Sequence, residues 1–235
     1  MTALMEADGI VKRFGAFTAL DGVTLRVAPG ERVGVIGPNG SGKTTLMNVI
    51  AGRMRADGGV VRFDGRALGT MPAWRRARLG IARSFQVPLP FAGLSLRDNL
   101  RVPLEQQGEA EAGARADALL EEFGLGRRAG DLAGDLSQVE LRKLELARAV
   151  AGRPRLLISD EAMAGLSGAE IDEVLALLMK LNATGIAVVM IEHLMRAIMR
   201  FSQRVMCLDL GRTIAEGTPD QVVAHPDVRR AYLGA

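Results

Sequence analysis

The octapeptide GPNGSGKT at residues 37–44 has the residue types and spacing that bind phosphate groups. Its three glycines allow backbone amides to turn inward around phosphate oxygens. An apolar run precedes the loop and helical periodicity follows it, so the phosphates would lie at a helix N-terminus, whose dipole favours anions. Lys43 would reach the β- and γ-phosphates, and the Thr44 hydroxyl would be a Mg²⁺ ligand. The alternative is a glycine-rich turn that binds nothing, which the strand–loop–helix context disfavours.

Two acids end a later apolar run, LLISDE at 156–161. A strand here would deliver Asp160 to the metal side of the phosphates and place Glu161 as general base for an attacking water. His193 follows another apolar run and is expected at the same carboxyl edge of a parallel sheet, where ligands collect. Such acids or a lone histidine are commonly structural. Their combination with the loop predicts phosphate hydrolysis, with His193 sensing the γ-phosphate.

The elements that must hold these residues follow from periodicity. Short alternating runs in the first 36 residues, broken by PGE at 29–31, predict strands joined by tight turns. Helical periodicity covers 43–51, and GGVVRFDG at 58–65 predicts another strand. The apolar runs before the two acids and before the histidine are typical of buried parallel strands linked by crossovers.

Composition limits the class of protein. With 235 residues, 48% hydrophobic and 24% charged, the chain can form a domain with a proper core, and disorder is excluded. The net charge is only +3, so nucleic acid is not expected as a partner. Cys207 is the single cysteine and is expected to be a buried strand thiol in a reducing compartment. No leader and no apolar stretch of ~18 residues is visible, which predicts a soluble chain that could dock on a membrane protein.

Together these motifs resemble the nucleotide-binding subunit of ABC transporters, over essentially the whole chain. Phe14 in KRFG matches the aromatic residue that stacks on adenine in that family, with a core phenylalanine as the alternative. Gln86 in GIARSFQ matches the glutamine that touches Mg²⁺ and water. Asp160, Glu161 and His193 match the magnesium aspartate, the catalytic glutamate and the switch histidine.

The resemblance implies ATP and Mg²⁺ as ligands and a full set of site residues. The catalytic positions would be Glu161, His193 and Gln86, and the metal ligands Thr44, Gln86 and Asp160. The nucleotide-binding positions would be Phe14, Gly37, Asn39, Gly40, Ser41, Gly42, Lys43, Thr44 and Thr45.

The resemblance also implies an α/β fold: a P-loop NTPase core with a mostly parallel sheet, an N-terminal antiparallel β subdomain and an inserted α-helical subdomain. A single ABC ATPase domain would span 1–235. Its nucleotide-binding core would cover 1–86 and 152–235, and its helical subdomain about 87–151.

LSQVE at 136–140 matches the position of the family's signature motif, usually LSGGQ. Two such domains stack head to tail in the family, so Ser137, Gln138 and Glu140 would act on a partner's ATP. Here Gln138-Val139 replaces the glycine pair and Glu140 replaces the final glutamine. A β-branched valine restricts the backbone where glycine allows close approach.

Ser137 can still cap the signature helix, while Glu140 would mildly repel a triphosphate unless it paired with Arg142 or Lys143. The loop after the catalytic glutamate departs from the family at Ala162 and Ser167. All elements for the chain's own ATP are present. We therefore predict hydrolysis at its own loop and a weaker or altered contact with the partner's ATP.

Several stretches look like the branched-chain amino acid uptake type of ABC protein: GIARSFQ at 80–86, MAGL at 163–166, VMIEH at 189–193, GRTIAEGTP at 211–219 and AYLG at 231–234. This implies the ATPase of an importer of branched-chain amino acids or similar small polar solutes, cytoplasmic and peripheral on the inner face of the cell membrane. Its partners would be a second ABC ATPase subunit (homo- or heterodimer), membrane permease subunits and, indirectly, a periplasmic or surface solute-binding protein. The alternatives are the ATPase of a lipopolysaccharide-type exporter and a soluble ABC ATPase with a regulatory role.

Two surface features are candidates for contact at the membrane. PLPF at 88–91 would form a stiff apolar loop that receives a permease's coupling helix, with an ordinary surface loop as the alternative. Trp74 and the arginines of AWRRAR at 73–78, Arg76 among them, could meet lipid headgroups, although a solvated helix face is favoured.

Overall fold

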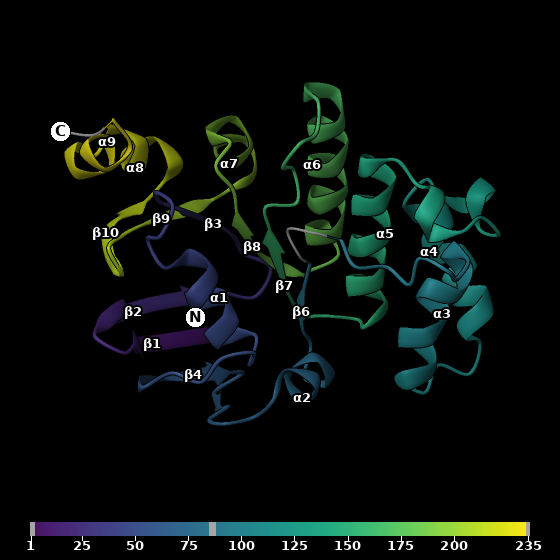
Figure 1. Ribbon diagram of the computed structural model, residues 1–235, viewed down its shortest axis with the longest axis horizontal. Helices are drawn as coiled ribbons and strands as arrows, with labels where there is room; N and C mark the ends of the chain where they lie inside the picture. The colour runs from purple at the N-terminus through teal and green to yellow at the C-terminus, as the bar shows by residue number, and fades with distance from the viewer. Residues whose placement is uncertain (1–2, 85–87, 234–235) are drawn as a thin grey trace.

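The computed structural model describes residues 3–84 and 88–233 and contains two β-sheets with helices against them (Figure 1). The first sheet is antiparallel, in the order β2-β1-β4-β5. Its strands are β1 (Met5–Phe14), β2 (Phe17–Val27), β4 (Gly58–Phe63) and β5 (Arg66–Ala67). Val23, Leu25 and Val27 are buried while Arg26 is exposed, the alternation expected of a sheet with one face on the core.

The second sheet has the order β10-β9-β3-β8-β7-β6, in which β10 pairs antiparallel with β9 and the other pairs are parallel. Its strands are β3 (Arg32–Ile36), β6 (Ile81–Arg83), β7 (Leu156–Asp160), β8 (Ala187–Ile191), β9 (Arg204–Asp209) and β10 (Arg212–Gly217). Successive residues enter different apolar clusters: Val188 and Met190 join one, Val189 and Ile191 the other. Both faces of the sheet are therefore covered, which explains the continuous apolar runs.

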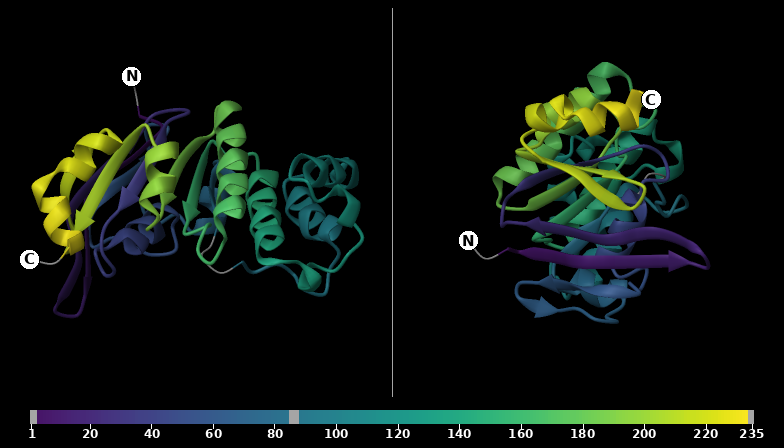
Figure 2. Two further views of the ribbon diagram at one scale, coloured as in Figure 1. Left: turned by 90° about the horizontal axis from the view of Figure 1, so that it is seen from above. Right: turned by 90° about the vertical axis from the view of Figure 1, so that its left-hand side faces the viewer.

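The two faces of the parallel sheet carry different layers (Figures 1 and 2). Helix α1 (Lys43–Ile50) and the antiparallel sheet lie on one face, and α6 (Gly168–Ala183) and α7 (Met195–Phe201) lie on the other. Helix α2 (Ala73–Arg78) precedes β6. The C-terminal helices α8 (Pro219–Ala224) and α9 (Pro226–Leu233) pack beside β10.

A group of helices stands at the opposite end of the molecule from α8 and α9 (Figure 1). It contains α3 (Leu96–Gln106), α4 (Ala112–Glu122) and α5 (Gln138–Ala151), with short 3₁₀ turns at Gly126–Arg128 and Ala133–Asp135. Ser95 caps α3 by accepting a hydrogen bond from the amide of Asp98 (3.0 Å). Helix α5 contacts α3, α4 and α6, so the apolar core of this group continues into that of the sheet. The predicted fold class is confirmed.

Two expectations about single residues have opposite outcomes. Cys207 lies buried in β9, as predicted, and burial raises the pKa of its thiol to about 11. The expectation that Arg76 shares a surface with Trp74 is wrong, because Arg76 is 3% exposed and donates to the carbonyls of Val49 and Ile50. These carbonyls lie in the last turn of α1, where the carbonyl groups lack their usual partners one turn further along the helix. Within residues 3–84 and 88–233, no helix combines the length and apolarity needed to span a membrane.

Candidate functional site

The glycine-rich loop joins β3 to α1, and its backbone requires glycine. Gly37, Gly40 and Gly42 have φ values of 148°, 79° and 104°, which residues with a Cβ rarely adopt. Space imposes a second requirement at the first position, since a Cβ on Gly37 would lie 2.1 Å from the carbonyl oxygen of Leu208. The loop is thus held against the end of β9.

Lys43, the first residue of α1, folds back over this loop. Its ammonium group donates to the carbonyl oxygens of Gly37 (2.7 Å) and Pro38 (2.8 Å). Burial lowers the pKa of Lys43, and the negative charges of Glu161 and Asp160 act in the opposite direction. The lysine, the loop and the two acids therefore form one electrostatic unit.

A cavity of about 240 Å³ opens beside the loop and brings most of the predicted nucleotide-binding residues together. It is lined by Phe14, Phe17, Ala19, Asn39, Gly40, Ser41, Gly42, Lys43, Thr44, Thr45 and Glu161. Gly37 lies buried at the base of the loop, outside this lining. Phe14 is 48% exposed, so it is not a core residue. Phe17, 60% exposed, was not predicted; its signal in the sequence was its position across a two-residue turn from Phe14.

Glu161 and His193 lie in direct contact. The His193 Nε2 atom is 2.5 Å from Glu161 Oε1, and the glutamate side chain is 13% exposed. They meet because β7 and β8 are parallel neighbours in which Asp160 pairs with Ile191. Glu161 has a φ of 48°, a left-handed conformation that is strained for a residue with a side chain. The adjacent acid and histidine predicted at one sheet edge are brought together.

Asp160 has a partner that the sequence did not reveal. Arg83 on the neighbouring strand β6 donates to its carboxylate at 2.5 Å, and both side chains are less than a tenth exposed, at 6% and 7%. Arg83 also donates to the Asn48 side chain (2.7 Å). Carboxylate and hydroxyl oxygens are ligands that suit Mg²⁺, so Asp160 and the exposed Thr44 fit that ion by donor type. Gln86, the other predicted metal ligand, lies outside the described residues.

Glu192 supports the loop that follows the acids. It is 2% exposed and accepts a hydrogen bond from the amide of Met163 (2.9 Å). Burial is the main cause that raises the pKa of Glu192 to about 7, and the nearby charge of Glu161 acts in the same direction. This carboxyl group, next to His193 in the chain, was not singled out from the sequence.

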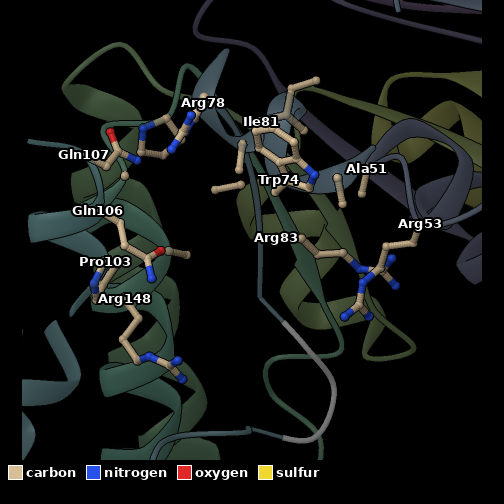
Figure 3. Close-up of a pocket in the computed structure, with 16 residues that line it drawn as sticks. Ala51, Arg53, Trp74, Arg78, Ile81, Arg83, Pro103, Gln106, Gln107 and Arg148 are labelled. Carbon is tan, nitrogen blue, oxygen red and sulfur yellow. The ribbon is translucent and has the colours of Figure 1, made fainter. Parts of the chain in front are cut away.

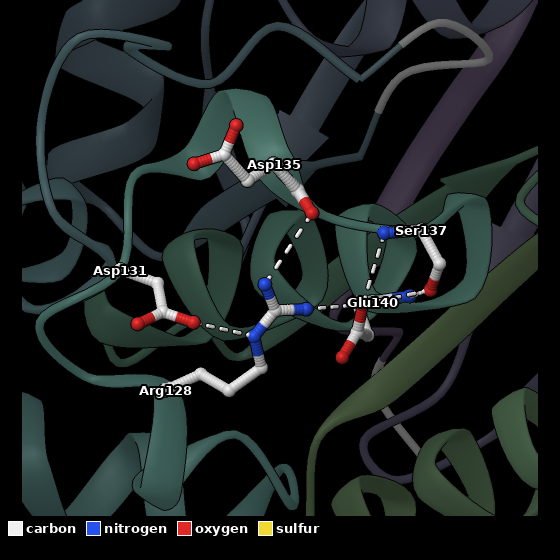
Figure 4. A network of polar contacts seen from close by, with 5 residues as sticks. All are labelled: Arg128, Asp131, Asp135, Ser137 and Glu140. Carbon is white, nitrogen blue, oxygen red and sulfur yellow. Dashed lines mark hydrogen bonds and ion pairs between the residues drawn. The ribbon is translucent and has the colours of Figure 1, made fainter.

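Ser137 is the N-cap of α5, as predicted, and Glu140 completes a capping box with it (Figure 4). The Glu140 carboxylate accepts hydrogen bonds from the Ser137 amide (2.9 Å) and hydroxyl (2.8 Å). Arg128 donates to the same carboxylate at 2.7 Å and to Asp131 at 2.7 Å. Burial opposes ionisation, but the hydrogen bonds from Arg128 and Ser137 lower the pKa of Glu140 to about 2. The serine hydroxyl is thus turned toward its own helix.

Neither of the two basic residues named above as possible partners of Glu140 pairs with it. Lys143 instead forms an ion pair with Glu173 on α6 (2.5 Å), and Arg142 donates to the carbonyl of Ala164 (3.5 Å). A residue two positions along a helix faces another side, so Arg142 cannot meet Glu140. The signature positions Ser137, Gln138 and Glu140 are absent from the lining given above for the loop cavity. Ser167 caps α6 through a capping box with Glu170.

A larger groove, of about 440 Å³, lies between the sheets and the helical group (Figure 3). Trp74, Arg78 and Arg83 line its sheet side, and α3 and α5 line the other, with Pro103 and Arg148. Arg148 donates to the carbonyl of Leu89 (2.8 Å) and lies 5.0 Å from the centre of the Phe91 ring. The 88–91 stretch is therefore tied to this groove, with Leu89 and Phe91 exposed.

Comparison of the sequence with known proteins shows the family to which the chain belongs. Residues 20–164 match the family described as ABC transporter, and residues 212–235 match the family described as branched-chain amino acid ATP-binding cassette transporter. The chain is 36% identical to the high-affinity branched-chain amino acid transport ATP-binding protein BraF of Pseudomonas aeruginosa, with 98% of each chain covered. It belongs to the ABC transporter family.

Other members of the ABC family are also similar to the chain over nearly its full length. The high-affinity branched-chain amino acid transport ATP-binding protein LivG of Escherichia coli is 35% identical, with 98% of both chains covered. The crystal structure of the ADP conformation of MJ1267, an ATP-binding cassette of an ABC transporter, superposes with a TM-score of 0.91 at 30% identity over 100% of both chains. This ABC protein is accordingly an ATP-binding subunit with ATP hydrolysis as its activity.

Proposed function

We propose that this ABC ATPase energises a membrane importer of branched-chain amino acids or similar small polar solutes. The observation that carries the ATPase part is the loop cavity, where Lys43 and Glu161 line one space and His193 touches Glu161. The import part is supported by the printed names of BraF and LivG, both branched-chain amino acid transport proteins. We further propose that the chain acts at the cytoplasmic face of the cell membrane, with a solute-binding protein as an indirect partner.

The residue roles in this proposal follow from chemistry and placement. Phe14 and Phe17 stack on the adenine, the loop amides and Lys43 bind the phosphates, and Glu161 takes the proton of the attacking water while His193 orients it. Thr44, Asp160 and Gln86 would hold Mg²⁺, which supplies neutralisation of phosphate charge when bound. Arg83 balances the charge of Asp160 in the described structure.

Nucleotide binding is proposed to close a pair of ABC ATPase subunits, and hydrolysis to reopen them. A dimeric relative, the ATP-binding cassette MJ0796 bound to ADP and Pi, supports pairing, at 26% identity and a TM-score of 0.82. In the proposed domain division, the nucleotide-binding core covers residues 1–86 and 152–235, and the helical subdomain covers about 87–151. A permease segment would dock in the groove of Figure 3, whose arginines and Trp74 could hold an apolar segment with acidic residues.

The two sides of the dimer are proposed to differ. The residues for the chain's own ATP are gathered around its loop, whereas Gln138, Glu140 and Ser167 replace usual residues on the surface presented to the partner. If the partner is a different subunit, disabling its catalytic base should reduce turnover less than disabling Glu161. Equal losses would count against the asymmetry.

The test reconstitutes the chain with its membrane subunits in proteoliposomes and measures ATP-driven uptake of labelled leucine. Glu161→Gln should lower ATP turnover about 100-fold or more while ATP still binds. Glu105→Gln, an exposed glutamate on α3, is the matched control and should leave turnover unchanged. Unchanged turnover in Glu161→Gln would refute the assigned base. ATP-dependent export, or uptake indifferent to ATP, would refute the importer.

A further inference from the structure

The first glycine of the phosphate loop is held by a residue from the far end of the chain. The amide of Gly37 donates a hydrogen bond to the hydroxyl oxygen of Tyr232 at 2.7 Å, across 195 positions of sequence. Tyr232 lies on α9, in the segment after β10 that has no part in the nucleotide chemistry proposed above. The hydroxyl reaches the base of the loop although the side chain as a whole is 40% exposed.

Gly37 has little freedom to find another partner. It is buried, and an added Cβ would meet both the Leu208 carbonyl oxygen (2.1 Å) and the Ser41 hydroxyl (2.6 Å). A buried amide left without an acceptor is costly. Burial also raises the pKa of Tyr232 to about 12, so the phenol stays neutral at physiological pH. The contact is therefore an uncharged hydrogen bond that pH leaves intact in the cell.

The amide and the carbonyl oxygen of Gly37 have different partners, and nucleotide binding would displace only one of them. Its amide is held by Tyr232, and its carbonyl oxygen accepts from the Lys43 ammonium at 2.7 Å. A nucleotide's phosphates would draw Lys43 away from that carbonyl. Tyr232 then remains as the contact that keeps Gly37 against β9. Without the Tyr232 hydrogen bond, Lys43 would still hold the empty loop through the Gly37 carbonyl, whereas the ATP-bound loop would lose both contacts. Loss of this hydrogen bond would therefore destabilise the ATP-bound form more than the free form.

We propose that Tyr232 is a positioning residue for ATP binding: its hydroxyl anchors the first glycine of the phosphate loop and links α9 to nucleotide occupancy. This inference rests on the proposed ATP site. Because Tyr232 touches no reacting atom, it should affect ATP affinity and leave the chemical step alone.

Tyr232→Phe removes the hydroxyl and keeps the ring. The Kd for ATP, measured calorimetrically on the full chain in the Glu161→Gln background, should rise about fivefold, the effect of one neutral hydrogen bond. In the otherwise unchanged chain, KM should rise similarly with kcat within about twofold. Thr213→Val, which removes an exposed hydroxyl from β10, is the matched control and should change neither value.

The chain offers a direct probe because Tyr232 is its single tyrosine. A chain whose tyrosine is labelled only at the ring Cζ atom gives one NMR signal, which should shift when saturating Mg²⁺-ATP is added. If ATP binds but the signal does not shift, or if Tyr232→Phe lowers the melting temperature with an unchanged Kd, Tyr232 has a purely structural role and the inference is overturned while the ATP site stands. If calorimetry detects no ATP binding to the Glu161→Gln chain, the site and the inference both fail. The NMR result on the native tyrosine decides the matter if Tyr232→Phe does not fold.

Discussion

The pair formed by Arg128 and Glu140 is predicted to stabilise the start of the signature helix in a charge-dependent way. The perturbations are Glu140→Gln, Arg128→Ala and the double variant. Glutamine can still accept the hydrogen bond from the Ser137 amide, so the first change removes the charge and keeps part of the cap. The second leaves the carboxylate in place without its guanidinium.

The magnitude follows from the pKa of Glu140, which falls from 4.5 to about 2. At ~1.36 kcal/mol per pKa unit this corresponds to at most about 3 kcal/mol of stability. The glutamate side chain is 24% and the arginine 31% exposed, so solvent screening reduces the expected loss in Glu140→Gln to about 1–2 kcal/mol. We expect the two sites to be coupled, so the stability lost in the double variant should be smaller than the sum of the two single losses.

The pH dependence has a definite sign. The folded-state pKa of Glu140 lies below its ordinary value, so its stabilisation is present above pH 4.5 and is lost as the pH falls toward about 2. Urea unfolding at pH 7 and pH 3 measures it. The difference between wild type and Glu140→Gln should shrink to roughly half or less at pH 3. An equal difference at both pH values, or a coupling energy near zero, would refute this account of the cap.

The same substitution should change function in the opposite direction. Arg128 balances the Glu140 carboxylate, so Glu140→Gln leaves the Arg128 charge without its partner. A unit positive charge about 6 Å from the partner's γ-phosphate attracts it by ~0.7 kcal/mol in a water-like dielectric, which should lower the KM for ATP of the assembled transporter about threefold. A KM that rises would show that Glu140 assists the partner's nucleotide.

Three further predictions concern buried groups of the site. Because the pKa of Glu192 is raised to about 7, protonation of this group favours the folded state, and wild-type stability should fall as the pH rises from 4.5 through 7. Thermal melts at pH 5 and pH 8 should show this fall in the wild type but not in Glu192→Gln, and the same fall in both proteins would contradict the prediction. Gly37→Ala should cost about 3 kcal/mol or more in urea unfolding because its Cβ has no room, whereas Gly130→Ala, where a Cβ meets nothing within 4 Å, should cost less than about 1 kcal/mol. Arg83→Met should lower the free energy of unfolding in EDTA by about 3–5 kcal/mol because Asp160 stays buried without its ion pair, and saturating Mg²⁺-ATP should restore part of this loss. A loss below about 1 kcal/mol would show that the ion pair contributes little to stability.

Local sequence predicted the loop and the acids well because their geometry depends on neighbours in the chain. The three glycines, the strand before them and the helix after them fall within one short segment, and Asp160 and Glu161 end a strand as their apolar run indicates. The missed contacts join distant segments. Nothing local links Gly37 to Tyr232, and Arg83 meets Asp160 only because β6 and β7 are neighbours in the sheet.

The partner of Glu140 was missed for a different reason. The nearby basic residues Arg142 and Lys143 were the candidates that the sequence offered, but Arg142 faces another side of the helix and Lys143 pairs with Glu173 on α6. The true partner, Arg128, ends the 3₁₀ turn Gly126–Arg128, and a second 3₁₀ turn, Ala133–Asp135, separates it from the helix. Short-range periodicity does not predict the path of this segment.

The strand order has a consequence for synthesis on the ribosome. β3, which leads into the phosphate loop, pairs with β8 and β9, so Val33 waits for Val189 and Arg204 to be translated. The Tyr232 contact closes across 195 positions, which at typical elongation rates takes roughly 10 to 40 s. During that time the strand before the loop has an unpaired apolar edge of the kind that chaperones bind. The phosphate loop is thus one of the earliest parts of this ABC protein to be made and one of the last to gain its full set of contacts.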